Sequence, residues 1–220
     1  MSEPLVSVLL CTINRAERMK IAVDCFRQQT YPNLELIVVA SGVQDVSELV
    51  ADILNCTYIW STAKNLSTKR NAGIRAAQGT YICHFDDDDW SGPERVADQY
   101  AALLRGGPGK VMHGYSTAFW WDEVRNCASQ YRGSAWGATL FYERAWALEH
   151  PWLEDRDLAE DSPFISNASM SCALAHSDAR DNFVAVMHDG TAQRGYDPNF
   201  WPVIDRNLLP AEFRRLWRLS

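Results

Sequence analysis

A short apolar run that ends in four consecutive aspartates is the feature of this sequence that most restricts its fold. Residues 81–85 have the composition of a buried strand, and the four acids at 86–89 follow directly. Residues 90–93 then carry the glycine and proline of a turn that leads into a helix. Adjacent carboxylates repel one another, so the run favours a bound divalent cation, or else a hydrated loop or helix N-terminus. Its position predicts the strand-end edge of an α/β sheet, where such folds bind ligands.

The first hundred or so residues alternate between strand-like and helix-like segments. Short apolar runs predict further strands at residues 6–11, 34–40 and 57–60. Apolar residues at helical spacing, with turn signals between them, predict helices at residues 16–29, 45–54, 67–77 and 93–104. This alternation favours a mostly parallel sheet with right-handed connections. At 220 residues, of which 47% are hydrophobic, the chain is long enough for one α/β domain with a sizeable core.

The second half of the sequence is less regular and is rich in tryptophan. Flat aromatic rings either pack in a core or stack on sugar or base rings in a concave site, and spacing alone does not separate these alternatives. A late apolar run that starts at residue 184 predicts a strand that ends in His188. The clustered tryptophans are Trp120, Trp121, Trp136, Trp146 and Trp152.

The composition favours a cytoplasmic protein without stable membrane insertion. No stretch has the roughly 18 continuous apolar residues that span a bilayer, and the first residues lack a basic leader and a cleavage site. The six cysteines are scattered singly, without the close pairs of zinc or redox motifs, so disulfides are not expected. The formal net charge of -7 argues against broad nucleic-acid binding. A local basic cluster nevertheless precedes the acids, at Lys64, Lys69, Arg70 and Arg75.

Four segments, in this order and spacing, resemble the signature of family 2 glycosyltransferases with the GT-A fold. They are residues 6–15, 65–73, 77–81 and 85–89. The resemblance implies a single GT-A, Rossmann-like α/β domain whose central, mostly parallel mixed sheet is flanked by helices. Residues 1–105 would form its nucleotide-sugar-binding half, and residues 106–220 its acceptor-binding half with the catalytic base. The implied activity is an inverting sugar transfer from a nucleotide-diphosphate sugar, most simply a UDP-sugar, with Mn²⁺ or Mg²⁺.

The resemblance also assigns donor-binding residues in the first half. Thr12 and Arg15 follow the first strand and would belong to the donor pocket. Arg70 lies in a segment similar to the family's Ala-Arg-Asn-x-Gly element and would face the nucleotide; the alternative is a solvated helix charge. Family members usually carry aspartate after the second strand, where this chain has Ser41. The expected contact there is therefore a single hydrogen bond that Ser41 donates or accepts.

The acidic run would supply the family's Asp-x-Asp motif. By resemblance its two acids are Asp86 and Asp88, with Asp88 expected to contact the metal directly. Asp86 would reach the nucleotide ribose and also the metal. Asp87 would support donor binding, and Asp89 would support the pair. Carboxylates suit this task because Mg²⁺ and Mn²⁺ prefer oxygen ligands and keep positions open for phosphate oxygens.

An inverting transfer needs a base that takes the proton from the acceptor hydroxyl. Family members place it in a Glu-Asp pair that opens a helix, and Glu160 with Asp161 resembles this pair. Asp155, in an earlier Glu-Asp pair, is the competing candidate; an apolar helical face after Asp161 favours the later one. His188 ends the predicted late strand and is either a third metal ligand, as in many GT-A enzymes, or a structural hydrogen-bonding residue. His84 and His113 are weaker candidates.

Other functions fit the sequence less well. A haloacid-dehalogenase-type phosphatase requires threonine or valine soon after its acids, whereas Trp90 and Ser91 follow here. A sugar nucleotidyltransferase requires a glycine-rich basic loop after its first strand, where this chain has residues 12–15, Thr-Ile-Asn-Arg. The main alternative to an enzyme is a degenerate nucleotide- or glycan-binding module of the same fold. The acceptor is left open among a glycan, a protein and a modified nucleic-acid base.

Overall fold

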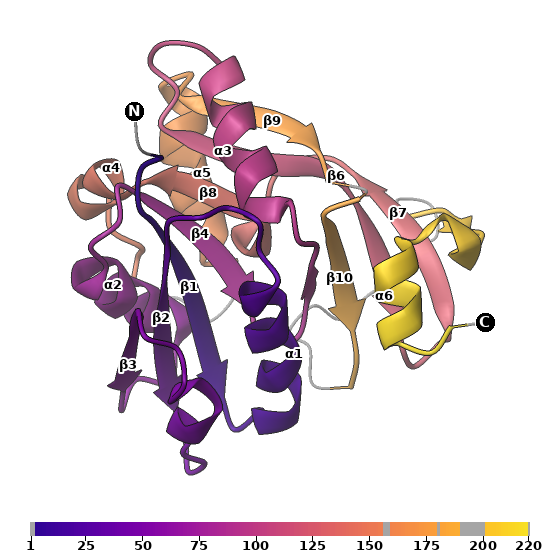
Figure 1. Cartoon of the computed structure of the whole chain (residues 1–220). Helices are drawn as coiled ribbons and strands as arrows, with labels where there is room; N and C mark the ends of the chain where they lie inside the picture. Colours follow the sequence, from indigo (N-terminus) through magenta and orange to yellow (C-terminus); the bar gives the residue numbers. More distant parts are fainter. Residues whose placement is uncertain (1–2, 156–158, 180, 190–200, 220) are drawn as a thin grey trace.

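Four parallel strands form the first part of a curved mixed sheet (Figure 1). In the computed structural model, which describes residues 3–155, 159–179, 181–189 and 201–219, they lie in the order β4-β1-β2-β3. Their sequences are apolar almost throughout, as is typical of parallel strands that are covered on both faces. The strands are β1 (Val6–Ile13), β2 (Leu34–Ser41), β3 (Cys56–Trp60) and β4 (Tyr81–Asp86).

Helices cover both faces of this sheet because successive strand side chains point to opposite sides. Leu36 and Val38 of β2 pack in one buried cluster, on the side of α1 (Ala16–Arg27) and α3 (Arg95–Arg105). Ile37 and Val39 pack in a second cluster on the other side. The helices there are α2 (Leu66–Ala76), α4 (Arg144–Glu149) and α5 (Asp161–Met170).

The second half extends the same sheet through one long strand, β6 (Met112–Asp122). It pairs in parallel with β9 (Leu174–Asp178) and β10 (Phe183–Met187), and antiparallel with β7 (Cys127–Arg132) and β8 (Leu140–Glu143). Because β8 also pairs with β4, the two halves share one sheet. The remaining elements are β5 (Trp90–Ser91), β11 (Val203–Ile204), η1 (Ser47–Val50), η2 (Gly137–Thr139), η3 (Arg206–Leu208) and α6 (Ala211–Leu216).

This architecture confirms the predicted α/β domain with a mixed sheet flanked by helices, and it corrects one element. The helix expected over residues 45–54 is wrong: only the single 3-10 turn η1 forms there. Its start is fixed instead by Asp45, which accepts hydrogen bonds from the Ser47 backbone N–H at 2.9 Å and from the Tyr58 hydroxyl at 2.8 Å. A side chain that bonds the backbone two residues on favours a turn over a continuing helix.

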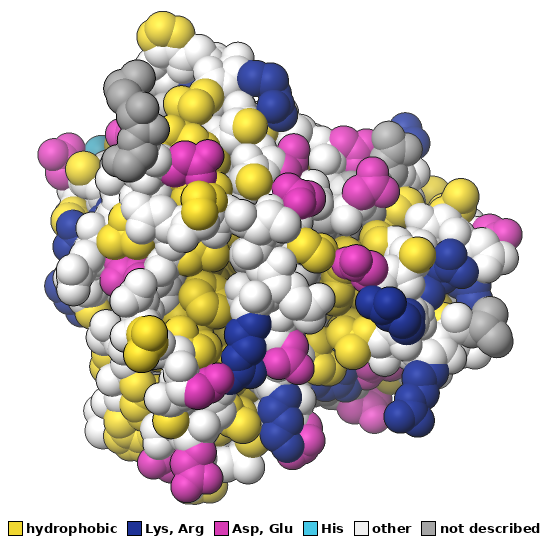
Figure 2. Space-filling model, in the orientation of Figure 1, with side chains coloured by type: hydrophobic (Ala, Val, Ile, Leu, Met, Phe, Trp, Pro, Cys, Tyr) yellow, Lys and Arg dark blue, Asp and Glu magenta, His cyan; other side chains and the backbone are white. Residues whose placement is uncertain are grey.

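The described surface carries charges of both signs. Figure 2 shows acidic and basic side chains interspersed over one face, with basic side chains gathered over α6. Arg214 and Arg215 belong to that helix. No helix within the described ranges combines the length and the apolar character needed to cross a bilayer.

A fully buried arginine ties the two halves together beneath the strand ends. Arg95, at the start of α3, donates hydrogen bonds to the Ser91 hydroxyl at 2.6 Å, to the His84 carbonyl oxygen at 2.7 Å, and to the Ala138 carbonyl oxygen. Its guanidinium lies between two aromatic rings, 4.8 Å from the centre of Phe85 and 4.6 Å from that of Phe183. The end of β4 is thereby held against η2, the turn that carries Gly137 and Ala138.

We expect Arg95→Met to lower the free energy of unfolding by about 2–4 kcal/mol, because two buried carbonyl oxygens lose their donor. Arg105→Met, in the exposed last turn of the same helix, is the matched control and should change it by less than about 0.5 kcal/mol. Urea unfolding followed by tryptophan fluorescence measures both. Equal effects of the two substitutions would show that Arg95 does not hold these elements together.

Candidate active site

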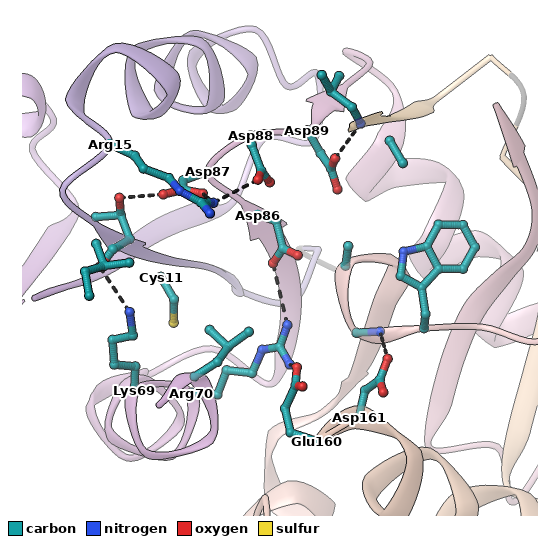
Figure 3. A pocket seen from close by; sticks show the side chains of 18 of the residues that line it. Cys11, Arg15, Lys69, Arg70, Asp86, Asp87, Asp88, Asp89, Glu160 and Asp161 are labelled. Carbon is teal, nitrogen blue, oxygen red and sulfur yellow. Dashed lines mark hydrogen bonds and ion pairs between the residues drawn. The ribbon is translucent and has the colours of Figure 1, made fainter. Parts of the chain in front are cut away.

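A cleft of about 670 Å³ opens where β1 and β4 end. Parallel strands place their carboxyl ends at the same edge, so the end of β1 and the acidic run after β4 lie next to each other there. The second half closes the cleft with η2 and the start of α5. Its polar lining consists chiefly of Thr12, Arg15, Lys69, Arg70, the four aspartates at 86–89, Glu160 and Asp161 (Figure 3).

Thr12 and Arg15 hold the middle of the acidic run. The Thr12 hydroxyl donates to Asp87 Oδ2 at 2.6 Å. Arg15 Nη1 donates to Asp87 Oδ1 at 3.0 Å and to Asp88 Oδ2 at 2.8 Å. Burial, and then the charge of Asp88, raises the pKa of Asp87, while Arg15 and Thr12 oppose the rise. The structure thus brings both sequence-predicted residues to the acids, and their first partners are protein carboxylates.

Asp88 and Asp89 connect the run to strand β10. His188, directly after β10, donates from Nε2 to Asp88 Oδ2 at 3.1 Å, and only about an eighth of each side chain is exposed. Asp89 is buried and accepts a hydrogen bond from the Val186 backbone N–H at 2.9 Å. Burial, followed by the charges of Asp88 and Asp86, raises the pKa of Asp89 well above its ordinary value. Asp89 therefore anchors the strand that presents His188.

The Asp88 and His188 pair fits a divalent cation. A carboxylate oxygen and an imidazole nitrogen form a donor set that suits Mn²⁺ and is compatible with Mg²⁺. Among the described residues, no group of three or more His, Cys, Asp or Glu side chains is placed to hold a metal ion. A cation held by this pair would take its remaining ligands from phosphate oxygens and water, which is the usual arrangement for Mg²⁺ with nucleotides.

Arg70 is buried and bridges two acids. It is 2% exposed, which excludes the alternative of a solvated helix charge. Its guanidinium lies 2.9 Å from Glu160 Oε1 and 3.6 Å from Asp86 Oδ1, and 4.3 Å above the ring of Trp152. Burial raises the pKa of Asp86 to about 6, an effect that Arg70 opposes. Arg70 does line the cleft, but its charge is already shared by protein carboxylates.

Glu160 and Asp161 are adjacent but have different hydrogen-bond partners. Glu160 accepts from Arg70, while Asp161 begins α5, lines the cleft and accepts from the Gly137 backbone N–H at 2.8 Å. Because Glu160 is fixed by a buried cation, the next residue is held at the mouth of the cleft. Asp155, the competing candidate, is exposed and is not among the residues that line the cleft.

Other candidates from the sequence have structural partners. Ser41 is 2% exposed, lies outside the cleft lining, and accepts a hydrogen bond from Lys69. His84 is buried; its Nδ1–H donates to the Gly137 carbonyl oxygen and its Nε2 accepts from the Tyr142 hydroxyl. Burial, and then the charge of Arg70, lowers the pKa of His84 well below its ordinary value. His113 is likewise buried, and its pKa is lowered to about 3 chiefly by that burial.

The tryptophans are found both in the core and in the cleft lining, and Trp120 belongs to both. Trp120 and Trp136 line the cleft, and their ring centres are 5.6 Å apart. Trp152 lies in the core under Arg70 and stacks on Phe164 of α5 at 4.2 Å. A long strand or a loop can carry an aromatic ring to either place, so only the tertiary structure separates them.

Sequence reasoning gave no role of its own to Lys69 or to Glu160. The Lys69 ammonium is 3% exposed and donates to the Thr12 carbonyl oxygen at 3.1 Å and to Ser41 Oγ at 3.3 Å. Burial lowers its pKa, and the charges of Cys11 and Asp87 oppose this. One signal was available: Lys69 shares the predicted helix with Arg70 and adjoins it, so both charges sit on one turn close to the strand ends.

The chain has the GT-A fold of solved glycosyltransferases. A crystal structure of S. aureus TarS, residues 1–349, in complex with UDP-GlcNAc matches 87% of this chain and 61% of its own, with a TM-score of 0.69 and 16% sequence identity. The mannosyltransferase PcManGT from Pyrobaculum calidifontis, in complex with GDP-Man and Mn²⁺, matches 88% of this chain and 59% of its own, with a TM-score of 0.67 and 18% identity. At these identities the likeness concerns the fold.

The sequence defines the family. The model of glycosyl transferase family 2 matches residues 7–152, more than half of the 220 residues, and the chain belongs to this family. The putative glycosyltransferase EpsH of Bacillus subtilis is 32% identical over 99 residues, which are 43% of this chain and 29% of EpsH. An uncharacterized glycosyltransferase of Haemophilus influenzae is 28% identical over 202 residues, 79% of this chain and 62% of that protein. The match thus spans about a third of several curated relatives.

The bridge between Arg70 and Glu160 gives a test of this geometry. We expect Arg70→Met to lower the free energy of unfolding by about 3–5 kcal/mol, because two partly buried carboxylates lose their common cation. Glu160→Gln should cost less, and the double variant should cost less than the sum, with a coupling of about 0.5–3 kcal/mol. Chemical unfolding of the four proteins measures the cycle. Arg75→Met, exposed on the same helix, is the control; strict additivity would rule out the bridge.

Proposed function

We propose that this chain is the catalytic unit of a metal-dependent, inverting glycosyltransferase that moves a sugar from a nucleotide-diphosphate sugar to an acceptor hydroxyl. One observation carries the proposal. Asp88, which contacts His188, and Asp161, at the start of α5, line the same cleft. The Asp88 and His188 pair suits the binding of a cation with a diphosphate, and the Asp161 carboxylate suits the role of proton acceptor.

At the donor end, the residues of this chain position a diphosphate. Asp88 and His188 would hold Mn²⁺ or Mg²⁺, which when bound stabilises the negative charge that develops on the leaving diphosphate. Arg15 orients the Asp88 carboxylate, and Thr12 with Arg15 fixes the neighbouring Asp87. Asp86, held near Arg70, remains the residue proposed to reach the ribose. The structural neighbours solved with UDP-GlcNAc and GDP-Man support a uridine or guanosine nucleotide as the donor.

At the acceptor end, Asp161 takes the proton. One of its carboxylate oxygens accepts from the Gly137 N–H, which leaves the other oxygen for the acceptor hydroxyl. As that hydroxyl oxygen attacks the anomeric carbon opposite the leaving diphosphate, its proton passes to Asp161, and the configuration inverts. Trp136 is half-buried, precedes Gly137 and offers a flat ring in the cleft, which favours a glycan or a modified nucleic-acid base over a protein as acceptor.

Both proposed halves of the domain supply residues to the site. Residues 1–105 supply Thr12, Arg15 and the acidic run to the donor end, and residues 106–220 supply Gly137 and Asp161 to the acceptor end. His188 belongs to the second half but contacts Asp88 in the first. We therefore propose one site built across both halves. We also propose that the protein acts in the cytoplasm, where it would meet a nucleotide sugar.

The first test is the metal dependence of donor binding. We expect Asp88→Ala to weaken Mn²⁺-dependent binding of UDP or GDP by about tenfold or more, because one of two protein ligands is lost. Isothermal titration calorimetry with Mn²⁺ and with EDTA measures this; Asp181→Ala, an exposed acid, is the control. Full retention of the metal-dependent component in Asp88→Ala would contradict the assignment.

The second test concerns the base. We expect Asp161→Asn to lower kcat by about 10²–10⁴-fold with little change in donor affinity, because the amide keeps the size of the side chain but takes no proton. Asp155→Asn should stay within about twofold of the unchanged protein. Release of nucleoside diphosphate from UDP- and GDP-sugars, with a panel of glycan acceptors, provides the assay. Donor binding without turnover in the unchanged chain would instead support a degenerate binding module.

A further inference from the structure

The buried ammonium of Lys69, a residue that lines the cleft, has one N–H group that no described residue accepts. Lys69 Nζ carries three N–H groups, and described residues accept two of them, at the Thr12 carbonyl oxygen and Ser41 Oγ. The side chain is 3% exposed yet lines the cleft. Within the described residues no carboxylate lies close enough to form an ion pair with it. A desolvated charge with an open donor is unfavourable until a ligand supplies an acceptor.

The position of Lys69 in the sheet shows which part of a donor it would meet. Its two partners stand at the ends of β1 and β2, which are neighbours in the sheet. The Asp88 and His188 pair lies on the other side of β1, beyond β4 and beside β10. In Figure 3, Cys11 separates Lys69 from the acidic run. A nucleotide whose diphosphate lies at Asp88 would therefore extend its base across the end of β1 towards Lys69.

We propose that Lys69 selects the base of the donor by donating its third hydrogen bond to an exocyclic carbonyl oxygen, at position 4 of a pyrimidine or position 6 of a purine. This inference rests on the proposed nucleotide-sugar function. Uracil and guanine carry an oxygen at that position, whereas cytosine and adenine carry an amino group. An ammonium has no acceptor, so opposite an amino group both donors would be buried without partners. A site built to donate a hydrogen bond rejects an analogue that cannot accept it.

Ser41 acts through Lys69 in this arrangement. Its hydroxyl oxygen accepts from the ammonium, and its own side chain lies outside the cleft lining. Ser41 is therefore a positioning residue. The contact with the base that was expected of Ser41 is assigned to Lys69 instead. A carboxylate at position 41 would satisfy the ammonium with a strong ion pair, whereas a hydroxyl leaves the charge available to a ligand.

The test compares paired nucleotides on the full chain in the presence of Mn²⁺. Titration calorimetry should show UDP binding more tightly than CDP, and GDP more tightly than ADP, by about tenfold or more in at least one pair. Lys69→Met should reduce that preference to about threefold or less, while its affinity for inorganic pyrophosphate with Mn²⁺ stays unchanged. Lys20→Met, which removes an exposed lysine of α1, is the matched control and should keep the full preference.

A second measurement needs no substitution. The diphosphate of the pyrimidin-2-one riboside lacks the oxygen at position 4, and the unchanged chain should bind it about tenfold more weakly than UDP if uracil is the preferred base. The proposal is overturned if amino and keto bases bind equally, or if Lys69→Met keeps the preference. A loss of UDP and CDP affinity by the same factor in Lys69→Met would also overturn it. Absence of binding by any nucleotide would overturn this proposal together with the proposed function, whereas binding without base preference overturns this one alone.

Discussion

Four adjacent carboxylates in one turn set the central constraint on this structure, because their mutual repulsion must be relieved by partners from elsewhere in the chain. The four side chains point apart, and together they reach α2, the end of β1 with Arg15, and β10. β1, α2 and β10 therefore meet at the acids, and the cleft is the space left between those elements. The partners are Arg70 for Asp86, Thr12 and Arg15 for Asp87, Arg15 and His188 for Asp88, and the Val186 N–H for Asp89.

The compensation is incomplete, and this has a consequence for binding. Burial still raises the pKa values of Asp86, Asp87 and Asp89 despite the neighbouring cations. Raised pKa values of acids mean that their ionised forms are less favourable in the folded chain than in water. A divalent cation beside Asp88 would stabilise the ionised forms of all three. The affinity of the proposed Asp88 site for a cation would thus be raised by neighbours that need not ligate the metal themselves.

The sequence predicts this part of the molecule well where the signal is local. Apolar runs locate the four parallel strands to within two residues, and the acids at the end of β4 mark the edge of the sheet that carries the cleft. The roles that remained hidden depend on long-range contacts. Glu160 contacts Arg70, which lies 90 positions earlier, and a local pattern carries no information on that pairing. The helix expected at 45–54 did not form, because the hydrogen bond that the Asp45 carboxylate accepts from the Ser47 backbone N–H outweighed a weak apolar periodicity.

The polar residues at the start of helix α2 are part of the site as well as part of the helix. Three consecutive polar residues, Lys69, Arg70 and Asn71, are all buried, although successive residues point about 100° apart around a helix. Buried polar side chains on such a wide arc require polar partners on several sides. Lys69 bonds the ends of β1 and β2, Arg70 bridges Asp86 to Glu160, and Asn71 exchanges two hydrogen bonds with the Trp152 backbone at 2.8 and 2.9 Å. The first turns of α2 therefore fix the ends of β1, β2 and β4 relative to Trp152 and Glu160.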